Sequence, residues 1–273
     1  MNCNVCGFVG RDGDTFCSSC GKPLARPEAD VVEQIETAPG TVTWGGREVA
    51  VGILLILMCV IPVGGIAFLM GEVGGRFKPA IAVWGSSHLM GFAILLIVWR
   101  VGLHPRRLSL SSLGLVAPTT SMVLTVLLSG LALGASLLFT MGYSTLVDYL
   151  GWEVLAPPDI LEEFGDIAFP GVAALATYEA LAMWTPLTEE IFFRGFVFAG
   201  FVPRMGIPRA IAVSALVFSA FHLFTGFVGV LAPIFITGVL LAWLYHRTGS
   251  LWPGIAVHAG QNALAVSAVV IGG

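Results

Sequence analysis

The chain has 273 residues, of which 56% are hydrophobic and only 11% charged, and its formal net charge is −4. A soluble domain carries about 25% charged residues, so this composition excludes an ordinary soluble protein and indicates a polytopic membrane protein. The slightly acidic balance, without a basic patch, also argues against a nucleic-acid-binding surface, and no nucleic-acid partner is expected.

Four of the five cysteines lie in two CxxC pairs near the N-terminus, Cys3 with Cys6 and Cys17 with Cys20. Each pair can turn two thiolates toward one ion, so four sulfurs complete a closed tetrahedral zinc site. Because a closed site lacks the open position of a catalytic zinc, we expect a structural Zn²⁺ that stabilises a module over residues 1–24. This segment resembles the small zinc ribbons at the termini of many prokaryotic proteins. The alternative is a pair of disulfides.

Residues 25–46 contain Pro, Glu, Asp, Thr and Gly without an apolar period, which indicates a flexible linker. The chain opens on Cys, Gly and polar residues rather than on a basic segment followed by an apolar core, so we expect no cleavable signal peptide. The transmembrane domain is expected to occupy residues 47–273.

Apolar windows of about 20 residues identify membrane-spanning helices. They fall near residues 49–70, 79–101, 119–142, 169–202, 209–225, 227–246 and 251–271. The fourth window is too long for one simple span, so its helix either tilts and kinks, with Pro186 as the candidate kink, or divides in two. The predicted fold is an all-α polytopic membrane protein with seven transmembrane helices, or eight if this window divides.

The distribution of charge favours a cytoplasmic N-terminus, because short cytoplasmic loops carry an excess of Lys and Arg. The loop after the second helix is flanked by Arg100, Arg106 and Arg107, whereas residues 143–168 hold six acidic residues and no basic one. Arg76 and Lys78 in the first loop oppose this topology. We expect a multi-pass protein of a prokaryotic plasma membrane, whose zinc ribbon could contact a protein partner in the cytoplasm.

Two carboxylates and a guanidinium, Glu189, Glu190 and Arg194, lie inside one of the most apolar stretches of the chain. Ionisable groups in a membrane segment are costly, so they usually face a protein interior or a wet cavity and mark a functional site. On a helix, Glu190 and Arg194 form an i, i+4 pair, while Glu189 is rotated by about 100°. We therefore expect Arg194 to neutralise Glu190, which leaves Glu189 as a candidate general base. The alternative is a pair of interfacial carboxylates at a helix end.

Two later apolar segments carry further polar groups, His222 on one and His258 with Asn262 on the other. A lone His in such a segment is more often a hydrogen-bonded structural group than a catalyst. Three polar clusters on three segments are different, because imidazole, carboxylate and amide groups cost several kcal/mol each when they are unpaired in hydrocarbon. They are expected to converge on one site. His88, with its neighbours Ser86 and Ser87, and Glu179 could extend a polar cavity, but we assign them to interhelical hydrogen bonding, outside the catalytic set.

The motifs Glu189-Glu190-xxx-Arg194, Phe218-xxx-His222 and His258-xxx-Asn262 together resemble the three-motif pattern of the CPBP family, the CAAX-protease and bacteriocin-processing intramembrane proteases. The resemblance covers about residues 169–271. It implies a membrane-embedded endopeptidase of the glutamate type, which cleaves a membrane-associated or lipidated protein or peptide without a catalytic metal.

The resemblance also implies a role for each polar group. Glu189 and His222 would activate the attacking water, and His258 and Asn262 would stabilise the oxyanion. Glu190 and Arg194 would maintain the site. These roles agree with the chemistry of the groups, since a carboxylate and an imidazole can share the proton of the water, and N–H donors can stabilise developing negative charge.

Three other functions stay open at this point. A zinc metalloprotease would suit two His and a Glu, although the HExxH spacing on one helix is missing. A non-enzymatic binding or bacteriocin-immunity-type membrane protein could keep the polar cluster for structure alone. A proton-coupled transporter is less favoured, because the sequence has no pair of interrupted segments with inverted-repeat character.

Overall fold

A computed structural model describes residues 42–73, 75, 78–158 and 172–272, together with Cys6, Phe8, Ser19 and Cys20. The chain divides into two compact units, Met1–Thr37 and Ala38–Gly273. All regular elements in the described ranges are helical, which confirms the predicted all-α class. Two of the predicted zinc ligands, Cys3 and Cys17, lie outside the described residues, and the other two, Cys6 and Cys20, are exposed. The predicted zinc ribbon therefore stays a prediction.

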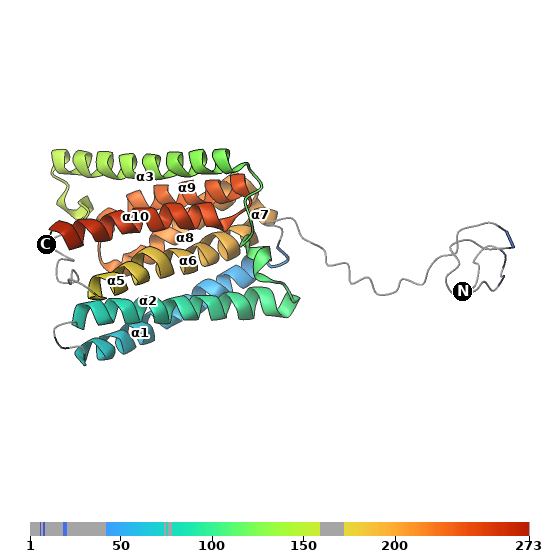
Figure 1. The fold of residues 1–273 in the computed structure, drawn as a ribbon, viewed down its shortest axis with the longest axis horizontal. Coiled ribbons are helices and arrows are strands. Elements are labelled where there is room, and N and C mark those ends of the chain that lie inside the picture. Colours follow the sequence, from blue (N-terminus) through green and yellow to red (C-terminus); the bar gives the residue numbers. More distant parts are fainter. Residues whose placement is uncertain are drawn as a thin grey trace. The chain divides into compact units, whose positions relative to one another are not determined.

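Six long helices agree in order with the predicted apolar windows (Figure 1). They are α1 (Gly46–Glu72), α2 (Lys78–Ile97), α3 (Met122–Leu150), α8 (Ile207–Phe221), α9 (Leu231–Thr248) and α10 (Leu251–Gly272). A π-helical turn, Val98–Leu103, and a 3-10 turn, His104–Arg106, extend α2. The main difference from the predicted ranges is α3, which runs eight residues beyond the predicted end at residue 142 because polar Ser144, Thr145 and Asp148 do not interrupt the helix.

The fourth predicted window forms one continuous helical run, Val172–Met205, which we call the central helix. It lies between α2 and α10 in Figure 1. The run consists of α5 (Val172–Tyr178), a first π-helical segment (Glu179–Trp184), α6 (Thr185–Glu190), a second π-helical segment (Ile191–Phe198) and α7 (Ala199–Met205). Pro186 does not divide the run. It lies in the first turn of α6, directly after the wide π-helical turns.

By length and apolarity, five helices in the described part of the chain could cross a membrane. They are Gly46–Glu72, Lys78–Arg106, Met122–Leu150, Ile207–Phe224 and Val228–Thr248. The central helix and α10 are not among these five. They carry Glu179, Glu189, Glu190 and Arg194, and His258, Gln261 and Asn262, respectively. These two helices carry most of the predicted site, whereas His222 lies on one of the five, Ile207–Phe224. The count of seven spans, or eight, stays a prediction.

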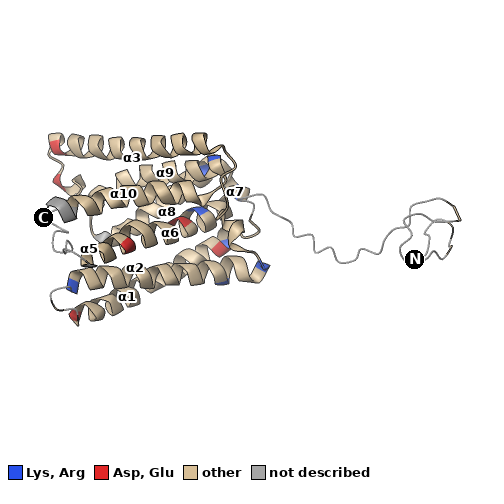
Figure 2. Cartoon of the chain, viewed as in Figure 1, with Lys and Arg blue, Asp and Glu red and all other residues tan. Residues whose placement is uncertain are grey.

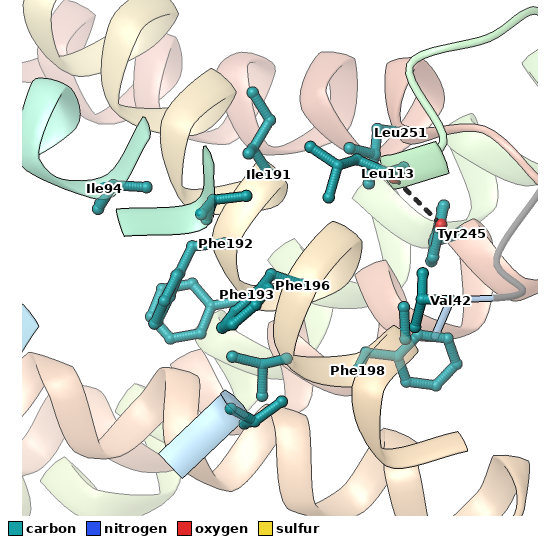
Figure 3. Packing of buried hydrophobic residues seen from close by; sticks show 14 of the residues in the cluster. Val42, Ile94, Leu113, Ile191, Phe192, Phe193, Phe196, Phe198, Tyr245 and Leu251 are labelled. Atoms are coloured by element: carbon teal, nitrogen blue, oxygen red, sulfur yellow. Dashed lines mark hydrogen bonds between the residues drawn. The ribbon is translucent and has the colours of Figure 1, made fainter. Parts of the chain in front are cut away.

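The hydrophobic core is built around the second π-helical segment of the central helix. All eight of its residues are buried. Figure 3 shows Phe192, Phe193, Phe196 and Phe198 on this segment, together with core residues from the surrounding elements. Tyr245 closes one side by donating a hydrogen bond to the Leu113 carbonyl oxygen over 3.1 Å. This packing fixes the helix that carries the two adjacent carboxylates.

Two residues near the end of the predicted linker, residues 25–46, belong to this core. Val42 and Trp44 are buried, and Trp44 is only 2% exposed. The Trp44 indole Nε1 donates to the Phe196 carbonyl oxygen over 2.9 Å, and its ring stacks on that of Phe196. The composition of residues 25–46 could not reveal this, because the contact depends on a helix about 150 residues later in the chain.

Charged residues of both signs lie at each end of the helices (Figure 2). Arg106 pairs with Glu48 over 2.9 Å at the start of α1, where Gly45 and Gly46 also lie against the Arg204 side chain of α7. At the end of α1, Lys78 forms an ion pair with Glu72. Lys78, one of two basic residues that oppose the predicted topology, is therefore neutralised locally.

Candidate active site

Glu190 and Arg194 form the predicted i, i+4 pair at the centre of the molecule. Arg194 Nη1 donates to Glu190 Oε1 over 2.7 Å, and the two side chains are 0% and 1% exposed, respectively. Removing two charges from water is expensive, so a buried pair needs good geometry and further hydrogen bonds. The short distance and complete burial indicate a structural ion pair.

Arg194 has two further contacts that compensate for its burial. Its Nη2 donates to the Gly238 carbonyl oxygen of α9 over 3.2 Å, and its guanidinium lies 4.4 Å from the centroid of the Phe218 ring on α8. A Cβ on Gly238 would lie 3.0 Å from Ala215 Cα, so the missing side chain permits this close crossing of α8 and α9. The guanidinium thereby connects the central helix to α8 and α9.

His258 on α10 lies between the two adjacent carboxylates. Its Nδ1 is 3.0 Å from Glu190 Oε1, and its Nε2 is 3.7 Å from Glu189 Oε2. An ionised carboxylate only accepts hydrogen bonds, so Nδ1 carries the proton in the contact with Glu190. The separation of 3.7 Å is too long for a direct hydrogen bond. Glu190 therefore orients the ring, and the Nε2 edge faces Glu189.

Glu189 differs from Glu190 in the way that the sequence predicts. Its side chain is 21% exposed, against 1% for Glu190. One carboxylate is held in an ion pair and the other is partly accessible, because successive residues of a helix point about 100° apart. Of the two, Glu189 is the one that a substrate or a water molecule can reach.

His222 lies at the end of α8 and contacts the same cluster through Phe218. Its Nδ1 donates to the Phe218 carbonyl oxygen over 3.0 Å, and its ring centroid is 5.0 Å from that of Phe218. The other edge-on neighbours of the Phe218 ring include His258, at 5.8 Å between centroids. Phe218 thus lies beside Arg194, His222 and His258. The predicted cooperation of His222 with Glu189 stays a prediction.

Asn262, one turn after His258 on α10, contacts the central helix at a different point. Its amide Nδ2 donates to the Leu181 carbonyl oxygen over 2.8 Å, within the first π-helical segment. The face of α10 that meets the central helix also includes Gly254, where a Cβ would lie 3.4 Å from Glu190 Oε2. Residues 254, 258 and 262 therefore follow one another at intervals of four along this face, and the predicted oxyanion role of Asn262 stays a prediction.

The described residues contain no group of three or more His, Cys, Asp or Glu side chains arranged to hold a metal ion. Within the same residues, Glu190 Oε2 and Arg194 Nε have no hydrogen-bond partner.

The arrangement can hold a proton on Glu189, orient two imidazole rings by their Nδ1 atoms and supply a fixed positive charge at Arg194. These are the requirements of general acid–base chemistry on a bound water molecule.

A second polar cluster lies between α2 and the first π-helical segment. His88 Nε2 is 3.2 Å from Glu179 Oε1, and Trp84 Nε1 donates to Glu179 Oε2 over 3.1 Å. The His88 ring stacks between Trp84 and Trp184. His88 thus forms an interhelical hydrogen bond, as expected, and its partner is Glu179. The separation of 91 residues explains why local sequence could not show this.

A third polar group joins α3, α9 and α10. Gln261 Nε2 donates to Ser136 Oγ over 2.9 Å, and Ser136 Oγ lies 2.6 Å from Thr237 Oγ1. Sequence analysis missed these residues because single hydroxyls in apolar helices are common and carry no motif. The cluster contains no ionisable group, so it fits interhelical hydrogen bonding.

Comparison with known proteins gives one family match. Residues 171–264 match the family model described as Type II CAAX prenyl endopeptidase Rce1-like. The matched segment runs from the start of the central helix into α10 and contains the three motifs of the candidate site. No curated protein and no solved structure matches the chain. The match confirms the resemblance stated from the sequence over this segment, and α1, α2 and α3 lie outside it.

Proposed function

We propose that this chain, whose residues 171–264 match the Rce1-like family model, is an intramembrane endopeptidase of the CPBP type that hydrolyses a peptide bond in a membrane-associated or lipidated protein or peptide. The family model supports protease activity of a membrane protein. The proposal adds the catalytic type, the substrate class and the role of each residue.

The observation that carries the proposal is the asymmetry of the two adjacent carboxylates. Glu190 is bound to Arg194 and His258, whereas Glu189 is partly exposed and faces His258 Nε2 across 3.7 Å. A cluster kept for structure alone has no need of a second carboxylate in a membrane segment, because an unpaired ionisable group there is costly. The asymmetry therefore favours an enzyme over a binding or immunity-type protein on the same scaffold.

In the proposed reaction, the oxygen of a water molecule attacks the carbonyl carbon of the scissile peptide bond. Glu189 accepts one proton of the water, and His222 shares this task through its Nε2, which carries the lone pair of the neutral ring when Nδ1 donates to Phe218. Collapse of the tetrahedral intermediate breaks the C–N bond, and the leaving nitrogen takes the proton. The products are a new carboxylate and a new amine.

His258 and Asn262 are the proposed donors to the oxyanion. Because His258 Nδ1–H is committed to Glu190, donation from its Nε2 requires the doubly protonated ring. Asn262 commits one of its two amide hydrogens to the Leu181 carbonyl oxygen and has a second one to offer. A single such donor often contributes about 3 kcal/mol to the stabilisation of the transition state.

The experiment is proteolysis in defined liposomes, in which a library of membrane peptides is incubated with the wild-type chain, Glu189→Ala or His222→Ala. The proposal expects cleavage by the wild type and a strong loss in both variants. Undiminished cleavage by both variants would contradict the assignment of the catalytic groups. If the wild type cleaves no member of the library but binds one, the binding-protein alternative gains support.

Metal analysis separates the glutamate mechanism from the metalloprotease alternative and also tests the zinc ribbon. The proposal places one structural Zn²⁺ on Cys3, Cys6, Cys17 and Cys20 and none at the membrane site. We therefore expect about one zinc per full chain and none in a chain that lacks residues 2–24, since four thiolates complete one tetrahedral site. Stoichiometric metal in an active truncated chain would favour the metalloprotease.

The proposed orientation places the N-terminus in the cytoplasm of a prokaryotic cell, where the zinc ribbon would contact a protein partner or the substrate. The basic residues Arg106 and Arg204, near the start of α1, support it, since cytoplasmic loops are enriched in Lys and Arg. Deletion of residues 2–24 is expected to change the choice of substrate and to leave cleavage of an accessible peptide intact.

A further inference from the structure

In π register, one backbone carbonyl of the first π-helical segment has no N–H group five residues later to accept from. The N–H of Thr185 donates to the Ala180 carbonyl oxygen, which is five residues earlier and therefore in π register. In the same register, the donor for the next carbonyl, that of Leu181, would be residue 186. Residue 186 is Pro, which has no backbone N–H.

Asn262 supplies the missing donor from another helix. Its Nδ2 lies 2.8 Å from the Leu181 carbonyl oxygen, which is an ordinary hydrogen-bond length. A backbone carbonyl that is shielded from water and lacks a partner is destabilising, so this partly buried contact stabilises the π-helical register specifically. In a regular α-helical register, the Leu181 carbonyl would instead accept from Thr185, and the amide of Asn262 would have no such acceptor.

The register of this segment determines where Glu189 and Glu190 point. They follow Pro186 by three and four residues, and a π-helical turn holds about one residue more than an α-helical turn. Loss of that extra residue would rotate the following residues by about 100° around the helix axis, since an α-helix has 3.6 residues per turn. Glu190 would then leave His258, which lies one turn from Asn262 on α10.

We infer that Asn262 is a positioning residue, which holds the π-helical register before Glu189 by donating to the carbonyl that Pro186 leaves unpaired. The expected effect of Asn262 on catalysis rests on the proposed function, whereas its effect on the helix register does not. Asn262 and His258 hold the central helix at two points one turn apart, Asn262 at the backbone of the π-helical segment and His258 at the carboxylates. The pair of contacts fixes both the rotation and the approach of Glu189.

A double-mutant cycle tests the inference, because Pro186→Ala restores a backbone N–H that can donate to the Leu181 carbonyl. Asn262→Ala in the wild-type background is expected to lower kcat by up to about 100-fold with a smaller change in KM, as misplacement of a catalytic group by about 1 Å does. In the Pro186→Ala background, the same substitution is expected to cost several-fold less. Equal losses in both backgrounds would show that Asn262 acts on the oxyanion alone and would overturn the inference.

Thermal unfolding of the same four chains repeats the cycle without any substrate. The inference expects the loss in unfolding midpoint caused by Asn262→Ala to shrink in the Pro186→Ala background, whether or not the protein is a protease. Gln261→Ala is the matched control, because Gln261 donates its amide to Ser136 rather than to the central helix. The loss in unfolding midpoint caused by Gln261→Ala should be the same in the wild-type and Pro186→Ala backgrounds. If the Pro186→Ala background reduced the losses of Gln261→Ala and Asn262→Ala equally, the inference would be contradicted.

A failure to fold is also informative. If Asn262→Ala alone cannot be purified, recovery of the Pro186→Ala/Asn262→Ala chain shows the same rescue at the level of folding. If Pro186→Ala alone is recovered and the double variant is not, the inference is contradicted. A wild-type chain that cleaves no peptide would remove the proposed function, and the unfolding cycle would still decide the role of Asn262.

Discussion

The central helix supplies the glutamate of two Glu–His pairs, an inner pair with His258 of α10 and an outer pair with His88 of α2. In the inner pair, Glu190 and His258 are 3.0 Å apart and almost completely buried. In the outer pair, Glu179 and His88 are 3.2 Å apart, and the Glu179 side chain is 45% exposed. The separations are similar, so distance between the groups does not distinguish a candidate catalytic cluster from a structural one.

The surroundings of the two pairs distinguish them. The inner pair has Arg194 as a fixed counter-charge and Glu189 as a second, partly exposed carboxylate. In the outer pair, both Glu179 oxygens are already engaged, one by His88 and the other by the Trp84 indole. The inner pair can therefore orient a reactive neighbour, whereas the outer pair has its hydrogen-bonding capacity used for packing α2 against the central helix.

The largest effect is expected from Glu189→Gln, which keeps the shape of the side chain and removes its basicity. Cleavage should fall by about 10²–10⁴-fold, the range for loss of a general base. The unfolding midpoint should change little, because the side chain is partly exposed and no ion pair shorter than 3.7 Å is formed. Rates on a cleaved peptide in liposomes, measured beside thermal unfolding, check both parts. If Glu189→Gln lowered the unfolding midpoint strongly as well as the cleavage rate, Glu189 would have a structural role.

A large effect on stability is expected from Arg194→Met, which leaves Glu190 buried without its counter-charge. Breaking a buried ion pair from one side costs about 3–5 kcal/mol. Adding Glu190→Gln should return part of this loss, because it removes the stranded charge, although it should not restore activity. Thermal unfolding in detergent compares the wild type, Arg194→Met and the double variant Arg194→Met/Glu190→Gln. An Arg194→Met chain as stable as the wild type would contradict the ion-pair assignment.

The smallest effect is expected from Glu179→Gln in the outer pair. Its amide oxygen can still accept a hydrogen bond from Trp84, so the rate should fall by no more than about fivefold, the equivalent of one typical hydrogen bond. Initial rates under the conditions used for Glu189→Gln give the comparison. A loss as large as that of Glu189→Gln would move the outer pair into the catalytic set.

The sequence predicted the helices and the ion pair between Glu190 and Arg194 because both depend on local spacing. Windows of apolar residues locate the helices, and four residues separate Glu190 from Arg194 on one helix face. Two residues of the site, His258 and Asn262, were also placed correctly on one face of the last helix, although their partners could not be assigned. Glu190 lies 68 residues from His258, and Leu181 lies 81 residues from Asn262.

The sequence could not predict the two π-helical segments, since their extra width depends on donors from other elements. Side chains of Trp44, Ser214 and Asn262 each donate to a carbonyl of these segments. Tertiary hydrogen bonds of this kind decide the register of a helix against its local preference. For the same reason, the burial of Trp44 in the predicted linker and the pairing of His88 with Glu179 became evident only in the folded chain.

The most direct measurement is the ratio of initial cleavage rates of Glu179→Gln and Glu189→Gln on one membrane peptide that the wild type cleaves. The two substitutions make the same chemical change on the same helix, so differences in expression and reconstitution can be corrected by the protein content of the liposomes. The account predicts that Glu179→Gln is faster than Glu189→Gln by about 20-fold or more, since only Glu189 serves as general base. A ratio near one, or one in favour of Glu189→Gln, would contradict it.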